Sequence, residues 1–331
     1  MAPPPILYLD NAAVRAAMPP VADRIDLAER AMLALIEDAD LPPKIGVDAR
    51  PAGSFGHAMP AFLRGPAADG SADLLGIKWV VGFPANAAAG LPTIHATVIL
   101  SDPLSGLPLA ILDGAPITAD RTAAVSGVAI RHWAPALPAE AAQVAILGAG
   151  VQARSHLSVI GHLLPGAAVR IHDRHPDRAA ALAEIAGHTA GIGSAVTAAS
   201  AAEATRDADL VLTVVSFGLV RQTLTTADLA AHALVIAVDY ATSVHHAVAL
   251  EASLFLVDEA GQFLANRAAG LFDGYPDPGS TIGRAIRAGV PRPAAGRTLV
   301  THLGVGLADL VFADAIVKAA TAAGLGLWLP R

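Results

Sequence analysis

The sequence predicts an α/β protein in which a doubly wound parallel sheet is accompanied by a second domain of the α+β type. Residues 144–257 alternate short β-branched strands with Ala-rich helices, a pattern typical of βαβ units. Residues 76–112 instead contain three strand-like runs with no helical pattern between them. With 331 residues, the chain exceeds the size at which one hydrophobic core usually stops growing, so we expect two domains.

Composition and charge favour a small-molecule ligand. Although 54% of the residues are hydrophobic, no window approaches the roughly 18–20 consecutive apolar residues of a membrane-spanning helix. The first residues lack the pattern of a secretory signal, so we expect a cytoplasmic protein. The absence of cysteine excludes disulfides, thiolate metal sites and cysteine nucleophiles. A net charge of -7 argues against nucleic-acid binding.

The elements before the central region divide into a helix, a group of strands and a second helix. Residues 20–38 place apolar side chains at helical spacing with charges between them, which predicts an amphipathic helix. Thr118 is a suitable N-cap for an Ala-rich helix over 119–133, and the Pro-containing residues 134–140 then predict a linker. The predicted strands are 77–81, 93–100 and 107–112, the last two joined by a short loop with Asp, Pro and Gly.

The central region predicts the parallel sheet, and the segment after it predicts a helix that returns to the first domain. Residues 303–327 contain Gly304 and Gly306 and then an apolar helical pattern. In the central region, helices are expected from Val151, from Pro176 and near Asp228. The strands expected there are 144–147, 168–172, 210–215, 234–238 and 254–257.

A glycine-rich turn between the first of these strands and its helix predicts a dinucleotide-binding loop. Gly148, Gly150 and Ala153 form a Gly-x-Gly-x-x-Ala motif, in which Val151 and Gln152 are the two residues before the alanine. The first glycine permits the tight turn, the second lets the backbone approach a pyrophosphate, and the small third residue lets helix and strand pack closely. The helix N-terminus then offers N–H groups to the phosphates.

The residues after the next strand bear on the choice between NAD and NADP. Asp173 follows the strand about 20 residues beyond the loop, where a carboxylate is expected to bind the ribose hydroxyls of NAD and repel the 2′-phosphate of NADP. Arg174 could pair with that phosphate instead. NAD is therefore the expected cofactor, and NADP remains an alternative.

Several motifs outside the loop, in order along the chain, resemble the ornithine cyclodeaminase/mu-crystallin family. They include the run Gly76 to His95 with its Gly-Ile-Lys sequence, the run Leu112 to Ala124 with Thr-Ala-Asp-Arg-Thr, the pair Met59-Pro60, and Leu303-Gly-Val-Gly-Leu-Ala-Asp309. The resemblance covers nearly the whole chain.

The resemblance implies an architecture and a reaction class. It implies a Rossmann domain over residues 123–302 and a substrate-binding and dimerisation domain built from residues 1–122 and 303–331, in a homodimer. Members of the family perform NAD(P)-linked conversions of small amino or imino acids. We also expect Thr118 and Ser216 to contact the cofactor.

The family's ligands for the substrate carboxylate correspond to Lys78 and Arg121, with Lys44 at the position of a third cation. Arg can hold a carboxylate through two parallel hydrogen bonds, so paired cations suit this ligand. The alternatives are that Lys78 extends from a strand to solvent and that Arg121 caps a helix. The family's catalytic aspartate corresponds to Asp239, after the strand 234–238. Here Tyr-Ala-Thr-Ser follows it, whereas Pro-Gly-Lys often does in the family.

A second departure concerns the substrate. Ornithine cyclodeaminases have a glutamate two residues before the Met-Pro pair, which contacts the substrate amine, whereas this chain has His57 two residues before Met59. His57 would not pair with a second ammonium group in that way. An anionic or neutral substrate side chain suits this part of the site better than ornithine, unless His57 only forms a structural hydrogen bond near a strand end.

Three functions are thus open. The first is an NAD(P)H-dependent reductase of small imino or ketimine acids, or the reverse dehydrogenase, with Lys78 and Asp239 as catalytic residues. The second is an ammonia-eliminating cyclodeaminase. The third, of a different class, is a dinucleotide-dependent small-ligand binding protein, because the family includes a lens component and hormone carrier. No metal site is expected, since spacings such as His-Glu-x-x-His are absent.

Overall fold

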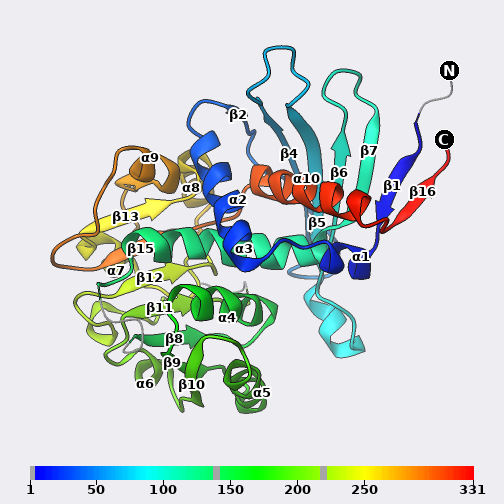
Figure 1. Ribbon diagram of the computed structural model, residues 1–331. Coiled ribbons are helices and arrows are strands. Elements are labelled where there is room, and N and C mark those ends of the chain that lie inside the picture. The colour runs from blue at the N-terminus through cyan, green and yellow to red at the C-terminus, as the bar shows by residue number, and fades with distance from the viewer. Residues whose placement is uncertain (1–3, 137–141, 217–221) are drawn as a thin grey trace. The chain divides into compact units, whose positions relative to one another are not determined.

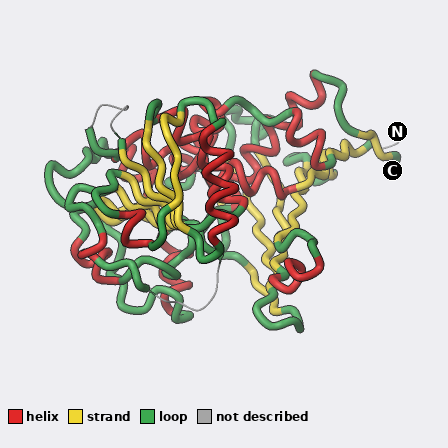
Figure 2. Tube along the Cα trace, turned by 90° about the horizontal axis from the view of Figure 1, so that it is seen from below, coloured by secondary structure: helices red, strands yellow, loops and turns green. Residues whose placement is uncertain are grey.

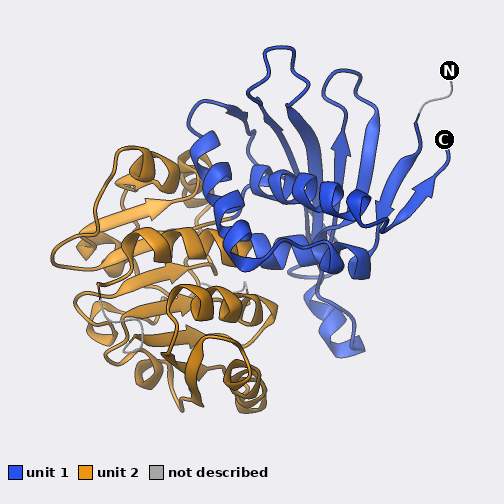
Figure 3. Cartoon of the chain, in the orientation of Figure 1, with its two compact units in different colours: residues 1–121, 304–331 blue, residues 122–303 orange. Residues whose placement is uncertain are grey.

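The computed structural model describes residues 4–136, 142–216 and 222–331. These residues form two compact units, one of residues 1–121 and 304–331 and the other of residues 122–303 (Figure 3). The division falls inside one helix, α3 (Gly114–Trp133), and directly before Gly304. Part of the predicted linker 134–140 lies outside the described residues.

The first unit is built on an eight-stranded mixed sheet with the strand order β16-β1-β7-β6-β5-β4-β2, in which β3 also pairs with β4. All pairs are antiparallel except β1 with β7. Strands from the two ends of the chain are neighbours at one edge (Figure 1). The strands are β1 (Ile6–Leu9), β2 (Ala39–Asp40), β3 (Ile45–Asp48), β4 (Phe55–Leu63), β5 (Leu74–Gly82), β6 (Ile94–Ser101), β7 (Pro108–Asp113) and β16 (Leu327–Leu329).

One face of this sheet is covered by the long apolar helix α10 (Gly306–Ala322), which contacts β4, β5 and β6. The helix α2 (Val21–Ala34) packs against α10 and ends four residues before the end of the predicted amphipathic helix. The short α1 (Asn11–Ala16) and a 3₁₀ turn, η1 (Pro84–Ala89), complete the unit. Side chains alternate along β5, so Gly76, Lys78 and Val80 are buried while Trp79 is exposed on the opposite face.

The structure corrects the predicted start of α3. The helix begins at Gly114, so Thr118 lies inside it and is not its N-cap. Asp113 performs the capping role, because its Oδ1 accepts a hydrogen bond of 2.8 Å from the N–H of Ala115. Pro116 is tolerated because residues of the first turn have no intrahelical partner for their N–H groups.

The second unit contains an eight-stranded, fully parallel sheet with the order β10-β9-β8-β11-β12-β15-β13-β14. The chain moves outward from β8 first to one side and then to the other, which confirms the predicted doubly wound α/β fold. Figure 2 shows these strands side by side with helices packed about them. The strands are β8 (Gln143–Leu147), β9 (Ala167–His172), β10 (Ile192–Thr197), β11 (Leu210–Thr213), β12 (Leu234–Ala237), β13 (Leu254–Val257), β14 (Ser280–Thr281) and β15 (Thr298–Thr301).

The connections of this sheet are mainly helical. The helix expected near Asp228 is only a 3₁₀ turn, η3 (Thr226–Asp228). Among the described residues, no helix of either unit is long and apolar enough to cross a membrane. The helices of the second unit are α4 (Val151–Leu163), α5 (Pro176–Gly187), α6 (Ala201–Thr205), α7 (His246–Glu251), α8 (Ala260–Ala268) and α9 (Ile282–Arg287).

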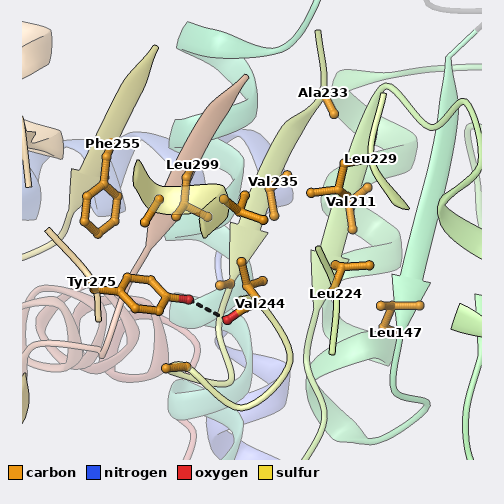
Figure 4. Packing of buried hydrophobic residues seen from close by; sticks show 14 of the residues in the cluster. Leu147, Val211, Leu224, Leu229, Ala233, Val235, Val244, Phe255, Tyr275 and Leu299 are labelled. Carbon is orange, nitrogen blue, oxygen red and sulfur yellow. Dashed lines mark hydrogen bonds between the residues drawn. The ribbon is translucent and has the colours of Figure 1, made fainter. Parts of the chain in front are cut away.

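A continuous apolar core fixes β11, β12, β13 and β15 to the segments that follow them (Figure 4). Val211, Val235 and Leu299 are fully buried at its centre. The ring of Tyr275 packs in this core, and its hydroxyl group donates a hydrogen bond of 2.7 Å to the carbonyl oxygen of Val244. The loop after β12 is therefore anchored, which matters because this loop contains Asp239.

Candidate active site

In the first unit, two buried cations share one buried carboxylate. Lys78 Nζ lies 2.6 Å from Asp309 Oδ2, and Arg121 Nε lies 3.0 Å from Asp309 Oδ1. The three residues are at most 5% exposed and come from β5, α3 and α10. Lys78 Nζ also lies 3.5 Å from the hydroxyl oxygen of Thr118. The structure therefore brings together Lys78, Arg121 and Thr118, with Asp309 as the group that joins the two cations.

The electrostatics of this cluster make the charge of Lys78 adjustable near neutral pH. Burial and the neighbouring Arg121 lower the pKa of Lys78 to about 7, although Asp309 acts in the opposite direction. The guanidinium of Arg121 lies against the backbone of Gly304, whose φ is +78°, and a Cβ at that position would come within 2.4 Å of Arg121 Nη1. Only glycine fits there, which explains one glycine of the closing Leu-Gly-Val-Gly motif.

Met59 and His57 lie on the same face of the sheet as Lys78. Met59 is directly opposite Lys78 in the β4–β5 register, and His57 is opposite Val80. Burial lowers the pKa of His57, and the charges of Lys44 and Lys78 lower it further, whereas Asp48 raises it. His57 is therefore neutral at pH 7 and has two cations nearby. Such a place is electrostatically unfavourable for a further positive charge.

In the second unit, the glycine motif has the geometry of a phosphate-binding turn. Gly148 has a φ of +104°, and a Cβ on it would lie 2.8 Å from the carbonyl oxygen of Val214. A Cβ on Gly150 would meet no atom within 4 Å, so the space beside its backbone is open. Gly150 is the N-cap of α4 and provides no side-chain cap, while Ala153 is fully buried in the first turn of the helix. The first turn thus offers N–H groups to an anion.

One exposed apolar side chain and one polar side chain lie beside the N–H groups of the first turn of α4. Val151 is 71% exposed at the start of α4, and Gln152 is half-buried next to it. Both side chains lie at the turn whose backbone N–H groups have no side-chain cap.

Asp173 connects the loop to the end of β9. Its Oδ2 accepts a hydrogen bond of 2.8 Å from the N–H of Ala149, and its Oδ1 accepts one of 2.8 Å from the N–H of His175. Arg174 is exposed and donates from Nε to His175 Nε2 at 3.1 Å. A carboxylate fixed beside the glycine loop, an open second glycine and an uncapped helix together fit a dinucleotide.

Asp239 is buried just after β12, at the carboxyl end of the parallel sheet. Its Oδ1 accepts a hydrogen bond of 2.7 Å from Thr213, and its Oδ2 accepts one of 2.6 Å from Ser243. Burial raises the pKa of Asp239 to about 6, although both hydroxyl groups act in the opposite direction. Tyr240, which follows it, has a φ of +59°, in the left-handed region that non-glycine residues adopt infrequently.

Sequence reasoning missed three residues of these clusters. Asp309 was part of a family motif, yet nothing in the sequence indicated that it contacts Lys78, 231 positions earlier. Thr213 is the last residue of β11, and Ser243 lies in the loop after β12. The sheet edge that they share with Asp239 becomes visible only once the strand order is known. Ser216 is exposed, and the residues directly after it lie outside the described chain. Among the described residues, no cluster of potential metal ligands is present.

Comparisons with known proteins agree with this geometry. Nodulation efficiency protein NfeD of Rhizobium meliloti is 30% identical over 290 residues, which cover 86% of each chain. Ketimine reductase mu-crystallin of Mus musculus is 35% identical over 149 residues, or 45% of this chain and 45% of its own. The structure of Thermococcus litoralis Delta(1)-pyrroline-2-carboxylate reductase, solved with NADH and L-proline, matches with a TM-score of 0.84 and 25% identity over 97% of this chain and 99% of that chain.

The names of these relatives include two reductases of carbon–nitrogen double bonds, one of them holding a dinucleotide. The sequence match to mu-crystallin covers less than half of either chain, whereas the structural match to the pyrroline-2-carboxylate reductase is nearly complete. A model of the ornithine cyclodeaminase/mu-crystallin family matches residues 19–256, which is most of the chain. As the motifs of its sequence predict, this chain belongs to the ornithine cyclodeaminase/mu-crystallin family.

Proposed function

We propose that this protein is an NAD(P)H-dependent reductase of small imino or ketimine acids, or a dehydrogenase in the reverse direction. The observation that supports this most strongly is the buried cluster of Lys78, Arg121 and Asp309. With Lys78 protonated, the cluster holds two positive charges and one negative charge, so it has an excess charge of one. A buried excess charge is costly, and a substrate carboxylate would neutralise it.

Lys78 would respond to the substrate carboxylate. A carboxylate beside its ammonium group raises the pKa of Lys78 from about 7, so the bound substrate favours the protonated lysine. Arg121 holds the carboxylate through its remaining N–H groups, whose planar arrangement matches a carboxylate. Thr118, within reach of Lys78 Nζ, restricts the position of the ammonium group.

The second unit supplies the cofactor site. Gly148, Gly150 and the first turn of α4 would hold the phosphates, and Asp173 the adenosine ribose, which favours NAD over NADP. The chemistry supplied by a bound nicotinamide is hydride exchange with the substrate α-carbon. Asp239 has a pKa of about 6, so near neutral pH it can both donate and accept a proton, and we assign it the proton of the substrate nitrogen.

His57 favours imine reduction over ornithine cyclisation. Cyclisation requires a substrate with a second ammonium group, yet His57 is neutral and lies near Lys44 and Lys78. Bringing another cation to this place is unfavourable because like charges repel in a partly buried site. A neutral or anionic substrate side chain avoids that repulsion.

The reaction can be tested by NADH oxidation in the presence of small imino acids. The substrates are pyruvate with ammonia, oxaloacetate with ammonia and a cyclic ketimine, and ornithine with catalytic NAD tests the alternative reaction. We expect reduction of at least one imino acid and no proline from ornithine. The variant Lys78→Met should lose about 10- to 100-fold in kcat/KM, because a charge-assisted hydrogen bond of a buried group, about 1.5–3 kcal/mol, is removed. Lys318→Met is the matched control, since Lys318 is 74% exposed. Proline formation without imine reduction would refute the proposal.

We also propose that the uncovered face of the first sheet forms a homodimer. Tyr8, Ile111, Ile99 and Ile77 stand in one row across β1, β7, β6 and β5, on the face opposite Lys78, and Trp79 is 43% exposed beside them. A contiguous apolar row of this kind marks an interaction surface. Trp79→Glu should shift the molar mass measured by light scattering from dimer to monomer, while Trp328→Glu, outside the row, should leave it unchanged. A wild-type protein of monomer mass would contradict this proposal.

A further inference from the structure

A buried hydrogen-bond network in the second unit contains two histidines and one serine that the proposed reaction does not use. Ser126 Oγ lies 2.8 Å from His156 Nε2 and 2.9 Å from His302 Nε2. The three residues are at most 2% exposed and come from α3, α4 and the end of β15. His156 Nδ1 lies 2.6 Å from the carbonyl oxygen of Gln152, in the first turn of α4.

The chemistry of the four groups permits one arrangement of protons. A carbonyl oxygen only accepts, so His156 Nδ1 must donate to Gln152. Burial lowers the pKa of His156 to about 4, so the ring is neutral and its Nε2 is an acceptor. Ser126 must therefore donate its single hydroxyl proton to His156. His302 Nε2 must then donate to Ser126, because the serine has no second proton to give.

This fixed direction distinguishes the network from a catalytic serine and histidine pair. Ser126 is fully buried, and the acceptor of the His156 Nδ1 proton is a main-chain carbonyl rather than a carboxylate. The network instead holds a specific piece of backbone, because the Gln152 carbonyl belongs to the turn that begins with Gly150. Ser155 Oγ donates to the same carbonyl at 2.9 Å.

A second observation connects this turn with a ligand. Gln152 Oε1 is buried and has no hydrogen-bond partner among the described residues, while Val151 beside it is 71% exposed. A buried acceptor without a partner is costly unless a bound group satisfies it. The turn held by the network is thus the turn at which a ligand is expected.

We propose that His156, Ser126 and His302 are positioning residues that hold the first turn of α4 in the orientation required for binding the dinucleotide phosphates. The inference rests on the proposed function only for the identity of the ligand. The residues do not touch the reacting atoms, so they should affect the affinity for the cofactor rather than the chemical step. Preorganised N–H groups bind an anion without first paying the cost of ordering the turn.

The affinity test compares four variants with the wild type by NADH fluorescence titration and steady-state kinetics. Ser126→Ala should weaken NADH binding about 5- to 10-fold and raise the KM for NADH similarly, with kcat changed less than about twofold, because the loss corresponds to one hydrogen bond. His302→Gln keeps a donor near the position of Nε2 and should restore most of the affinity that His302→Leu loses. Ser158→Ala is the matched control, since Ser158 lies on α4 and donates only to the Ser155 carbonyl within the described structure.

The proton arrangement can be tested without measuring cofactor binding. Nitrogen-15 spectra of histidine-labelled protein, with the His156 signal assigned from His156→Gln, should show His156 as the neutral Nδ1–H form at pH 7. The Nε2–H form, or equal NADH affinity of Ser126→Ala and wild type, would overturn the inference. A wild-type protein that binds NADH but reduces no imino acid would overturn the proposed reaction alone. A wild-type protein that binds no NADH would overturn both.

Discussion

Replacing Asp309 with asparagine removes the carboxylate that both Lys78 and Arg121 contact. The substitution keeps the size of the side chain, so its main effect is electrostatic. Removing one partner of a buried ion pair costs roughly 3–5 kcal/mol in the free energy of unfolding, because a charge is left buried without compensation. The structure further predicts that this loss depends on pH in a particular direction.

The direction follows from Lys78. Asp309 raises the pKa of Lys78, so in Asp309→Asn that pKa falls below its wild-type value of about 7, while in the unfolded chain it stays at 10.5. In the wild type well below pH 7, both folded and unfolded states hold the Lys78 proton, and this group gives little slope. In the variant, the folded state binds this proton only at a lower pH, so between the two pKa values the unfolded state holds more protons than the folded one. Its free energy of unfolding therefore falls faster with decreasing pH than that of the wild type, by at most about 1.4 kcal/mol per pH unit.

Urea denaturation of both proteins at pH 5.5, 6, 6.5, 7 and 8 measures this difference. Other titrating groups are common to both proteins and cancel to first order. Asp314→Asn is the matched control on the same helix, because Asp314 pairs only with the exposed Lys318 among the described residues and should cost less than about 1 kcal/mol at every pH. Parallel stability curves for Asp309→Asn and wild type would show that Asp309 does not hold the charge of Lys78 and would refute this prediction.

Two further predictions concern the second unit. Ser243→Ala removes a hydrogen bond that lowers the pKa of Asp239. The acid limb of the pH profile of kcat/KM in the oxidative direction, expected near pH 6, should therefore move up by about one pH unit. An unmoved limb would argue that Asp239 is not the titrating group. Gly150→Ala should keep the wild-type melting temperature, because its Cβ meets no protein atom, yet it should lose NADH binding, because the Cβ occupies the space beside the backbone that the ligand needs. Gly148→Ala should lower the melting temperature, because its Cβ meets the Val214 carbonyl oxygen at 2.8 Å. Equal melting temperatures for these two variants, or undiminished NADH binding by Gly150→Ala, would contradict the assignment of the loop.

Local patterns predicted the fold of the second unit well. The strand, the glycine motif and the helix after it are adjacent in sequence, so their chemistry could be interpreted without a structure. Strand β15 was missed because its four residues, Thr298–Thr301, begin and end with threonine and lack the continuous apolar run of β12 and β13. It lies between β12 and β13 in the sheet, although β13 precedes it in the chain. Strand β10, at the sheet edge, lacks the continuous apolar run of its neighbours.

The candidate site was predicted only where a motif marked it. Lys78 and Arg121 were identified through family motifs, because a lysine in a strand and an arginine in a helix are ordinary by themselves. The partner they share could not be found, since α10 reaches β5 only after the whole second unit has been inserted in the sequence. The start of α3 was wrong because Pro116 suggests a break, although a proline in the first turn is compatible with a helix.

The discontinuity of the first unit has a consequence for how the protein folds during synthesis. Residues 122–303 form one uninterrupted segment and can fold as soon as they leave the ribosome. The sheet that contains Lys78 is made earlier, yet it lacks α10 and the Asp309 carboxylate until the last part of the chain arrives. Until then β4, β5 and β6 expose the apolar face that α10 later covers, together with an unpaired lysine. The nascent chain should therefore depend on chaperones in the interval between residue 121 and residue 322, and truncation before α10 should yield an aggregating first unit beside a folded second one.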